Sequence, residues 1–427
     1  MGVLKLYPSK LRGEVRIPPS KSIAHRAVIC ASLGCGVSKI KNINLSDDII
    51  ATIEGMKSLG ATIQDKGDYL EIKGIDRSKK SDKVIDCNES GSTLRFLIPI
   101  SIAICEGARF VGRGNLGKRP LDTYYEIFDK QGISYNYAED ELNLSICGKL
   151  KPGEFKVEGN ISSQFITGLL LSLPLLDGDS KIIITTELES RGYLDLTLNT
   201  MRDFGIDIIN NDYKEFIIKG NQTYKSIDYK VEGDYSQGAF YLCADAIGSD
   251  VSILDLKSNS FQGDREVINI LNRMGMEFVD RQGKISGYAK ELKSTIIDGS
   301  QCPDIIPVLS VVASLSKGRT EIINAKRLRI KECDRLNAVA VELSKLGAKI
   351  EEKKDSLIID GVDYFLGGVE VWSHNDHRIA MTLAIASTRC KEPIVIKDFE
   401  CISKSYPKFF DDFKMLGGSF DEWHVGQ

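Results

Sequence analysis

The stretch PDIIPVLSVVASLSKG, from Pro303 to Gly318, is apolar on nearly every face of the helix that it predicts. Such a helix cannot lie at a surface, so we expect it to be buried at the centre of a domain. Five other segments share this character and begin at polar residues with nearly the same period. Together with Asp304 these residues are Ser22, Ser92, Ser163, Ser236 and Asp376, with intervals of 68 to 73 residues between successive members.

A second element recurs with a similar period. Six amphipathic stretches end in a glycine, as in LSKLGA, and a glycine after the last apolar residue stops a helix. These glycines are Gly60, Gly132, Gly205, Gly275, Gly347 and Gly417, which lie 70 to 73 residues apart. A short β-rich run precedes each stretch, and another follows most of them. The sequence therefore predicts six α/β units, each with one inner helix, one outer helix and several strands.

Length and composition limit the class of protein. A chain of 427 residues favours two domains of three units each, with a boundary near residues 226–230. With 42% hydrophobic and 27% charged residues, the composition is that of a soluble globular protein. The start, MGVLKLYPSK, has no apolar signal core, and no apolar run is long enough for a membrane span. Ten cysteines without a C-x-x-C pair, and only four histidines, indicate reduced thiols in the cytoplasm and argue against a structural zinc site.

The starts of the inner helices carry the first functional signal. A helix N-terminus has unpaired N–H groups and a partial positive charge, so six equivalent starts predict an anion-binding site between the two halves. A serine or aspartate there is most often only an N-cap. Cations are different because they oppose the helix dipole, and Lys21, Arg95 and Arg378 lie near such starts. We therefore expect anions beside these side chains.

The segment AKRLRIKECDR, from Ala325 to Arg335, concentrates five cations although the chain has a net charge of −4. A solvated charged face is the usual reading of such a run. Here the run enters the outer helix of the fifth unit, which should begin near Glu332, and Lys331 and Arg335 are i,i+4 neighbours. Equivalent entering loops carry Arg119, Ser190 with Tyr193, and Lys404. The recurrence favours a binding site for an anion over a solvated face.

Eight motifs now resemble one family. PPSKSIAHR, SGSTLR, GKRPL, NISSQF, ESRGYLDLTL, RLRIKECDRL, NDHRIAM and SKSYP occur in the order found in the 5-enolpyruvylshikimate-3-phosphate synthase family, and the resemblance covers essentially the whole chain. It implies a two-domain inside-out α/β barrel with six βαβαββ-type repeats, three per domain, around buried central helices. It also implies that the first strand crosses over. The expected domains are then residues 1–18 plus 229–427, on the side rich in phosphoenolpyruvate ligands, and residues 19–228, on the side rich in shikimate 3-phosphate ligands, with the active site in the cleft between them.

The resemblance also implies an activity and its ligands. The family transfers the enolpyruvyl group of phosphoenolpyruvate to the 5-hydroxyl of shikimate 3-phosphate and releases phosphate, in the shikimate pathway of chorismate and aromatic amino acid biosynthesis. The expected phosphoenolpyruvate ligands are Lys21, Gly91, Arg119, Gln164, Arg335, Arg378 and Lys404. The expected shikimate 3-phosphate ligands are Lys21, Ser22, Arg26, Ser162, Ser163, Gln164, Ser190, Tyr193, Asp304 and Lys331. The retained Gly91 implies that the site accepts the inhibitor glyphosate. We also expect a monomer that closes on its substrates by induced fit, because the expected ligands lie on both sides of the domain boundary.

Three residues are candidates for proton transfer. Asp304 is the candidate base for the attacking hydroxyl, while Glu332 and Lys21 are candidates for adding a proton to the methylene carbon and removing one from the methyl group. The sequence leaves open which residue acts in which direction. We expect no metal and no organic cofactor, because cationic side chains and helix starts supply the electrophilic groups.

Some positions depart from the family pattern or suggest another class. Glu89 and Ser92 replace the usual asparagine and threonine before Arg95, Phe96 stands where proline or leucine is common, and Arg327 replaces an asparagine of some members. A sister transferase acting on UDP-N-acetylglucosamine uses a loop cysteine, but no matching loop surrounds Cys87, Cys105 or Cys147. Cys333, among cations at a helix start, has two interpretations: a packed structural thiol, which is the default, or a thiol more acidic than usual. A repeat scaffold such as a sliding clamp would instead spread its basic residues along one face.

Overall fold

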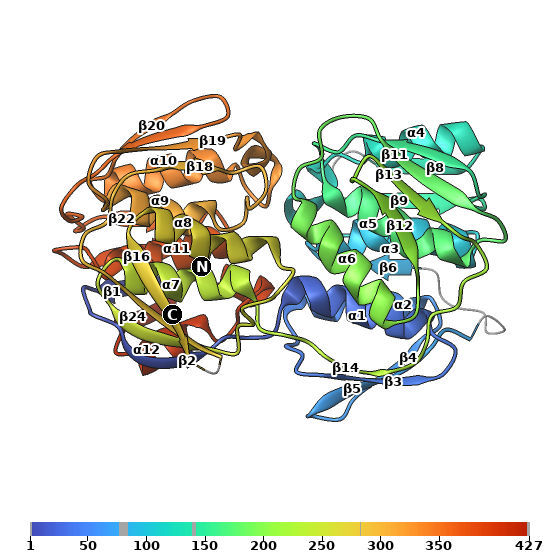
Figure 1. Cartoon of the computed structure of the whole chain (residues 1–427), viewed down its shortest axis with the longest axis horizontal. Coiled ribbons are helices and arrows are strands. Elements are labelled where there is room, and N and C mark those ends of the chain that lie inside the picture. Colours follow the sequence, from blue (N-terminus) through green and yellow to red (C-terminus); the bar gives the residue numbers. More distant parts are fainter. Residues whose placement is uncertain (1, 77–83, 139–141, 282, 425–427) are drawn as a thin grey trace. The chain divides into compact units, whose positions relative to one another are not determined.

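The computed structural model describes residues 2–76, 84–138, 142–281 and 283–424 of the chain. These residues form two compact units (Figure 1). One, the discontinuous unit, comprises the described residues of 1–18 and 233–427, and the other, the continuous unit, comprises those of 19–232. Each unit contains three four-stranded sheets among its described residues.

The continuous unit is built from three copies of one arrangement. In two copies the strand before the inner helix pairs in parallel with the strand after it, and in the copy around the first inner helix a strand from the C-terminal end of the unit takes that place. The third strand in each sheet order pairs antiparallel with its two neighbours. The sheet orders are β14-β3-β5-β4, β6-β7-β9-β8 and β10-β11-β13-β12. The strands are β3 (Val37–Lys41), β4 (Thr62–Asp65), β5 (Tyr69–Lys73), β6 (Val84–Asp86), β7 (Gly107–Val111), β8 (Ser134–Ala138), β9 (Asn143–Cys147), β10 (Glu154–Val157), β11 (Ser180–Ile184), β12 (Ile208–Asn211), β13 (Glu215–Ile218) and β14 (Asp228–Lys230). The inner helices are α1 (Lys21–Leu33), α3 (Gly91–Ile104) and α5 (Ser163–Ser172), the outer helices are α2 (Asp47–Ser58), α4 (Asp122–Gln131) and α6 (Arg191–Asp203), and η1 (Gly114–Lys118) and η2 (Leu173–Leu175) are short 3-10 turns.

The discontinuous unit repeats the arrangement with the sheet orders β16-β17-β15-β2, β18-β19-β21-β20 and β22-β23-β1-β24. Its strands are β1 (Gly2–Tyr7), β2 (Arg12–Arg16), β15 (Asp250–Leu254), β16 (Met276–Arg281), β17 (Lys284–Ala289), β18 (Ile296–Asp298), β19 (Arg319–Ile323), β20 (Lys349–Glu352), β21 (Leu357–Asp360), β22 (Glu370–Trp372), β23 (Ile394–Lys397) and β24 (Ser419–His424). The inner helices are α7 (Tyr235–Ala246), α9 (Ile306–Ser314) and α11 (His377–Ser387), and the outer helices are α8 (Glu266–Arg273), α10 (Arg335–Lys345) and α12 (Phe409–Met415). The 3-10 turns are η3 (Gly263–Arg265), η4 (Lys326–Ile330) and η5 (Phe399–Lys404).

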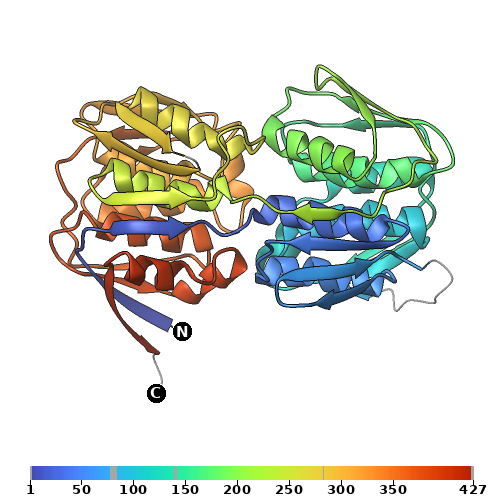
Figure 2. The ribbon, with the colours of Figure 1, turned by 60° about the horizontal axis from the view of Figure 1, so that its bottom comes forward.

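Segments distant in sequence complete three of the six sheets. β1 lies between β23 and β24 and is antiparallel to both, so that Leu4 faces Ile396 on one side and Glu422 on the other (Figure 2). β2 pairs in parallel with β15, and β14 pairs in parallel with β3. The chain therefore starts in the discontinuous unit, runs through the continuous unit and returns.

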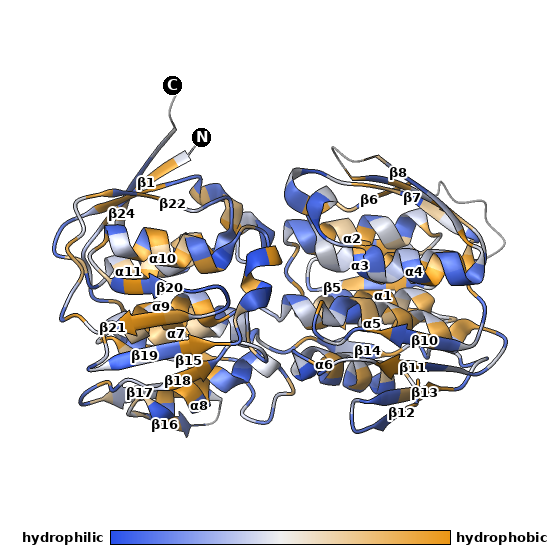
Figure 3. Ribbon diagram, turned by 90° about the horizontal axis from the view of Figure 1, so that it is seen from above, coloured by the Kyte–Doolittle hydropathy of each residue, from blue (hydrophilic) through white to orange (hydrophobic). Residues whose placement is uncertain are grey.

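The inner helices form the core of each unit, as their all-round apolar pattern predicted. Every residue of α7, α9 and α11 is buried, and apolar residues predominate on α9 and on the strands β15 and β21 in Figure 3. The six helix-stopping glycines all have positive φ, from 69° at Gly132 to 107° at Gly60, a backbone region that glycine enters without steric cost. The repeat interpretation of the sequence is thus confirmed.

Two helix boundaries differ from the prediction. α9 begins at Ile306 rather than at Asp304, with Pro307 in its first turn, where the missing N–H of a proline has no helical partner to lose. Asp304 instead lies in the turn before the helix. α10 begins at Arg335, three residues after the expected Glu332, and Asp334 caps it by accepting the N–H of Asn337 at 3.1 Å.

A proline inside α3 helps to fix the position of Arg95. Pro99 has no N–H, so the carbonyl of Arg95, four residues earlier, has no helical donor. The buried hydroxyl of Tyr124 on α4 donates to that carbonyl at 2.6 Å. Gly168 on α5 faces the same place, since a Cβ there would lie 2.4 Å from the Arg95 carbonyl oxygen. The close approach of α3 and α5 therefore depends on a glycine.

Candidate active site

The starts of α3 and α5 form one polar cluster in the continuous unit. Arg95 donates to Oε1 of Gln164 at 2.7 Å, and Nε2 of Gln164 donates to the Ser92 hydroxyl at 2.9 Å. Arg119, from the loop after η1, belongs to the same cluster, because a Cβ placed on Gly91 would lie 2.6 Å from its Nη1. We call these five residues the α3–α5 cluster. It places two guanidinium groups at two helix starts, which suits the binding of an anion.

Ser162 and Ser163 lie at the edge of this cluster. Ser162 is the N-cap of α5, and its hydroxyl accepts the N–H of Gln164 at 3.3 Å. Ser163 is the first helical residue, and both serines are buried. Both serines thus lie at the start of an inner helix, as the sequence predicted.

Lys21 opens α1 and is paired within the protein. Its Nζ lies 2.7 Å from Asp48 on α2, and both side chains are less than one-fifth exposed. A chain of hydrogen bonds continues from α1 through α2 to α3: His25 Nδ1 contacts the Thr52 hydroxyl at 2.7 Å, and Thr52 contacts Thr93 at 2.7 Å. Asp48 thus supplies an anion that the sequence analysis expected from a ligand. The pair of acidic residues that opens α2 was the signal for it.

Arg26 is buried among hydrogen-bond acceptors of the protein. Its guanidinium donates to the Thr197 hydroxyl at 2.8 Å, to the Ser22 carbonyl at 2.7 Å and to the Tyr193 carbonyl at 3.0 Å. Burial lowers the pKa of Arg26 to about 10. These bonds tie α1 to the first turn of α6, where Ser190 is the N-cap with a left-handed φ of 55°. Arg26 therefore sets the place of Ser190 and Tyr193 relative to Ser22.

A second cluster lies in the discontinuous unit and centres on Arg335. Its side chain is 1% exposed, and its Nε donates to Asp376 at 2.7 Å. Nη1 donates to Asp304 at 2.9 Å and Nη2 donates to Glu332 at 2.6 Å. Burial alone would lower the pKa of Arg335, but the three carboxylates together raise it well above its ordinary value. Arg335 is a fixed cation that holds three acidic side chains around it.

Asp304 is shared among three cations. Besides Arg335, its carboxylate lies 3.2 Å from Nζ of Lys331 and 3.3 Å from Nη2 of Arg378. Burial is the first cause that lowers the pKa of Lys331, and Asp304 opposes that effect. We call Asp304, Lys331, Glu332, Arg335, Asp376 and Arg378 the Asp304 cluster. Lys404 lies beside it, with Nζ donating to the Asn375 carbonyl at 3.1 Å.

A buried carboxylate adjoins the Asp304 cluster. Asp264 is 3% exposed and accepts a hydrogen bond from the Ser236 hydroxyl at the start of α7. Burial and, next, the charge of Asp304 raise its pKa to about 6. A carboxyl group that holds its proton to a higher pH than an exposed aspartate therefore lies beside the cluster.

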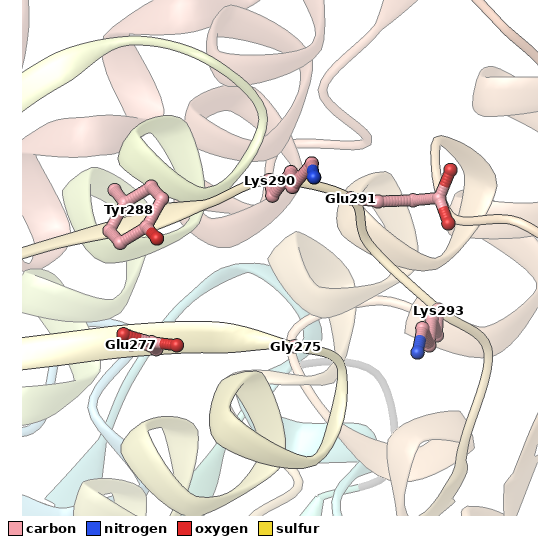
Figure 4. Close-up of a pocket in the computed structure, with 6 residues that line it drawn as sticks. All are labelled: Gly275, Glu277, Tyr288, Lys290, Glu291 and Lys293. Carbon is pink, nitrogen blue, oxygen red and sulfur yellow. The ribbon is translucent and has the colours of Figure 1, made fainter.

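Two pockets of the described residues lie away from both clusters. One, of about 420 Å³, is lined by Gly275, Glu277, Tyr288, Lys290, Glu291 and Lys293 beside the β16–β17 hairpin (Figure 4). The other, of about 330 Å³, lies at the C-terminal ends of α1 and α3 and includes Leu33, Cys35 and Ile104. Neither pocket is lined by a predicted site residue. In the described ranges no group of three or more His, Cys, Asp or Glu side chains is arranged to hold a metal ion.

Comparison with known proteins decides the family. The sequence model of EPSP synthase (3-phosphoshikimate 1-carboxyvinyltransferase) matches residues 6–413. This chain belongs to the EPSP synthase family. Proteins named 3-phosphoshikimate 1-carboxyvinyltransferase from Clostridioides difficile strain 630 and Clostridium beijerinckii are 70% and 69% identical to it, with 100% of each chain covered. The family assignment favours the EPSP synthase interpretation of the sequence over the sister transferase acting on UDP-N-acetylglucosamine and over the repeat scaffold.

Solved structures confirm the predicted fold class. An EPSP synthase from Acinetobacter baumannii has a TM-score of 0.83 at 24% identity, covering 99% of this chain and 100% of that one. The enolpyruvyl transferase NikO from Streptomyces tendae has a TM-score of 0.82 at 16% identity, covering 99% of both chains. The fold is therefore the two-domain inside-out α/β barrel of EPSP synthases. None of the helices that the structure describes is long and apolar enough to cross a membrane.

The residues expected from the EPSP synthase motifs fall into two groups. Lys21, Ser22, Arg26, Gly91, Arg119, Ser162, Ser163, Gln164, Ser190 and Tyr193 lie in the continuous unit, and Asp304, Lys331, Glu332, Arg335, Arg378 and Lys404 lie in the discontinuous unit. Within each unit the hydrogen bonds described above bring most of them together. Sequence reasoning missed Asp48 as the partner of Lys21 and Asp376 as the partner of Arg335.

Of the two interpretations of Cys333, the packed thiol is confirmed and the unusually acidic thiol is excluded. Burial raises the pKa of its thiol, and the neighbouring carboxylate of Asp376, 3.6 Å from Sγ, raises it further. The sequence showed the cations near Cys333 but not that Asp376, 43 residues later, packs against it. The cysteines of the chain, including Cys333, are free thiols.

Proposed function

We propose that this protein transfers the enolpyruvyl group of phosphoenolpyruvate to the 5-hydroxyl of shikimate 3-phosphate. The products are 5-enolpyruvylshikimate 3-phosphate and phosphate, and the reaction belongs to the shikimate pathway. One observation carries this conclusion: relatives named for this activity are 64–70% identical over nearly the full length of both chains. Both substrates bear a phosphate and a carboxylate, so the cationic clusters suit them chemically.

We further propose that the two clusters share the two substrates. Phosphoenolpyruvate would contact Lys21, Gly91, Arg119 and Gln164 from the continuous unit and Arg335, Arg378 and Lys404 from the discontinuous unit. Shikimate 3-phosphate would contact Lys21, Ser22, Arg26, Ser162, Ser163, Gln164, Ser190 and Tyr193 from the first and Asp304 and Lys331 from the second. The proximity of Gly91 to Arg119 supports the first set, because a glycine lets a ligand and a guanidinium approach the same backbone.

The reaction needs three proton transfers and releases one phosphate. The 5-hydroxyl oxygen bonds to the central carbon of the enolpyruvyl group as the hydroxyl loses its proton, for which Asp304 is the base. The methylene carbon gains a proton and becomes a methyl group, which then loses a proton as the bond to phosphate breaks. Glu332 and Lys21 are the groups for these transfers. Glu332 is bound to Arg335 at 2.6 Å and Lys21 to Asp48 at 2.7 Å, so both are held in place.

Fixed cations would stabilise the charge that develops on the leaving phosphate. Arg335 is suited to this role because it is buried and held by three carboxylates before any ligand binds. Preorganised charge needs no rearrangement when the phosphate leaves, and it therefore lowers the barrier rather than only the dissociation constant. A cytoplasmic location, a monomeric state and binding of glyphosate stay predictions.

Phosphate release tests the proposal. We expect the purified protein to release phosphate from phosphoenolpyruvate when shikimate 3-phosphate is present, and not from either substrate alone. UDP-N-acetylglucosamine serves as the control acceptor, since the sister transferase would use it. Release with UDP-N-acetylglucosamine and none with shikimate 3-phosphate would contradict the proposed function.

A further inference from the structure

Helix α10 holds one short segment, Trp372–Asp376, at two points. Arg335, in the first turn of α10, binds the Asp376 carboxylate through Nε and Nη2 at 2.7 and 3.2 Å. Glu342 follows Arg335 by seven residues and therefore lies on the same face of the helix, about 10 Å further along. Its Oε2 accepts the N–H of Trp372 at 3.1 Å, and its Oε1 lies 2.9 Å from Nε2 of His374. One face of α10 thus binds the segment at both of its ends.

The segment has an unusual backbone between these two points. His374 and Asn375 both have a φ of 54°. Residues other than glycine seldom adopt this left-handed conformation, because it costs conformational free energy. Such a backbone persists only where its surroundings hold it. Here the Asn375 N–H donates to the Ser373 hydroxyl at 3.2 Å, and the rings of Trp372 and His374 contact each other at a 30° tilt with centroids 4.1 Å apart.

Three cations assigned to phosphoenolpyruvate depend on this segment. The Asn375 carbonyl accepts from Lys404 at 3.1 Å. Asp376 binds Arg335 and also caps α11 by accepting the Arg378 N–H at 2.8 Å. A shift of the segment would therefore move Arg335, Arg378 and Lys404 relative to one another.

Glu342 is buried and fully paired, as a residue that holds a backbone segment in place should be. Its side chain is 2% exposed, and a buried carboxylate is unfavourable unless it is well paired. Both oxygens also lie 2.9 Å from Nζ of Lys345. Burial by itself raises the pKa of Glu342, but the bonds from His374, Lys345 and the Trp372 N–H outweigh it and lower the pKa below its ordinary value.

We propose that Glu342 is a positioning residue for phosphoenolpyruvate binding. It holds the left-handed turn at His374 and Asn375 so that Arg335, Arg378 and Lys404 face the same anion. The inference rests on the function proposed above. Glu342 touches none of the reacting groups, so its loss should act on the geometry of the cations and leave the shikimate 3-phosphate ligands of the continuous unit in place.

Steady-state kinetics of Glu342→Ala with each substrate varied in turn test this role. We expect KM for phosphoenolpyruvate to rise about tenfold or more, because small displacements of binding groups have large effects, while KM for shikimate 3-phosphate stays within about twofold. Glu342→Gln keeps one oxygen for the Trp372 N–H and should show a smaller rise. His374→Ala removes one contact from a partly exposed side chain, so it serves as a second variant if Glu342→Ala does not fold.

Asp245→Asn is the matched control. Asp245 is a buried carboxylate of the same unit that accepts the backbone N–H groups of Val251 and Gly287 at 3.1 and 3.0 Å. The Asp245→Asn variant should have a lower Tm than the wild-type protein and unchanged KM values for both substrates. The positioning role is wrong if the folded Glu342 and His374 variants behave like this control, with a lower Tm and an unchanged KM for phosphoenolpyruvate. Inactivity of the wild-type protein would instead contradict the proposed function itself.

Discussion

Replacing Arg335 by methionine should destabilise the discontinuous unit strongly. Arg335 is 1% exposed and Asp376 is completely buried, and they are joined by hydrogen bonds of 2.7 and 3.2 Å. Methionine fills a similar space with apolar atoms but leaves the Asp376 carboxylate without its cation. Removing one partner of a buried ion pair costs about 3–5 kcal/mol, so we expect the free energy of unfolding to fall by about that amount.

A double-mutant cycle separates the ion pair from the loss of packing. Asp376→Asn removes the charge, and its amide oxygen can still cap α11 by accepting the Arg378 N–H, because asparagine is a good N-cap. Arg335→Met with Asp376→Asn should therefore be less destabilised than the sum of the single variants by about 2 kcal/mol. Urea unfolding without ligand, followed by circular dichroism, measures the free energy of unfolding of the wild-type protein, the two single variants and the double variant. Strict additivity, or a loss below about 1 kcal/mol for Arg335→Met alone, would refute the reasoning.

Four further predictions follow from particular contacts. Arg119→Ala should lower kcat/KM by about 100-fold or more with little change in the Tm of the ligand-free protein, and an unchanged kcat/KM would remove Arg119 from the site. Cys333→Ser and Cys105→Ser should keep most activity, and a covalent substrate adduct on either thiol, seen by mass spectrometry, would contradict this. Burial, aided by nearby basic groups, holds the pKa of His25 well below 6.5, so the folded protein keeps it neutral while the unfolded chain binds a proton. The free energy of unfolding should then fall as the pH drops below about 6.5, by up to about 1.4 kcal/mol per pH unit. His25→Asn should reduce this slope. Equal slopes for the two proteins in urea unfolding would show that His25 does not titrate as described. Shikimate 3-phosphate should lower the radius of gyration in small-angle scattering and tighten phosphoenolpyruvate binding, and independent binding with an unchanged radius would exclude closure.

The repeat architecture could be predicted from the sequence because its signals are local. An all-round apolar helix such as α9 must be buried, and a glycine such as Gly347 marks a helix end through its own backbone freedom. The pairing of β1 with β23 and β24 has no such signal. Leu4 meets Ile396 across nearly the whole length of the chain, and only the family resemblance indicated that the first strand crosses over.

The site was predictable as a set of residue types but not as a set of contacts. Motif matches identified Arg335 and Asp304, whereas Asp376, the carboxylate that accepts two hydrogen bonds from Arg335, was predicted only to lie at a helix start. The sequence left the acidity of Cys333 open for the same reason, since the carboxylate packed against it belongs to Asp376, 43 residues later. Long-range partners such as Glu342 and His374 leave no periodic pattern, so only the structure reveals them.

Phosphorus NMR of one reaction mixture tests the central claim most directly. With phosphoenolpyruvate and shikimate 3-phosphate present, we expect the phosphoenolpyruvate signal to disappear as an equal amount of inorganic phosphate appears. The shikimate 3-phosphate signal should be replaced by that of a new phosphate monoester, because the enolpyruvyl group is transferred while the 3-phosphate is retained. Loss of phosphoenolpyruvate without a new monoester signal, or loss that proceeds equally without shikimate 3-phosphate, would show hydrolysis and contradict the transfer.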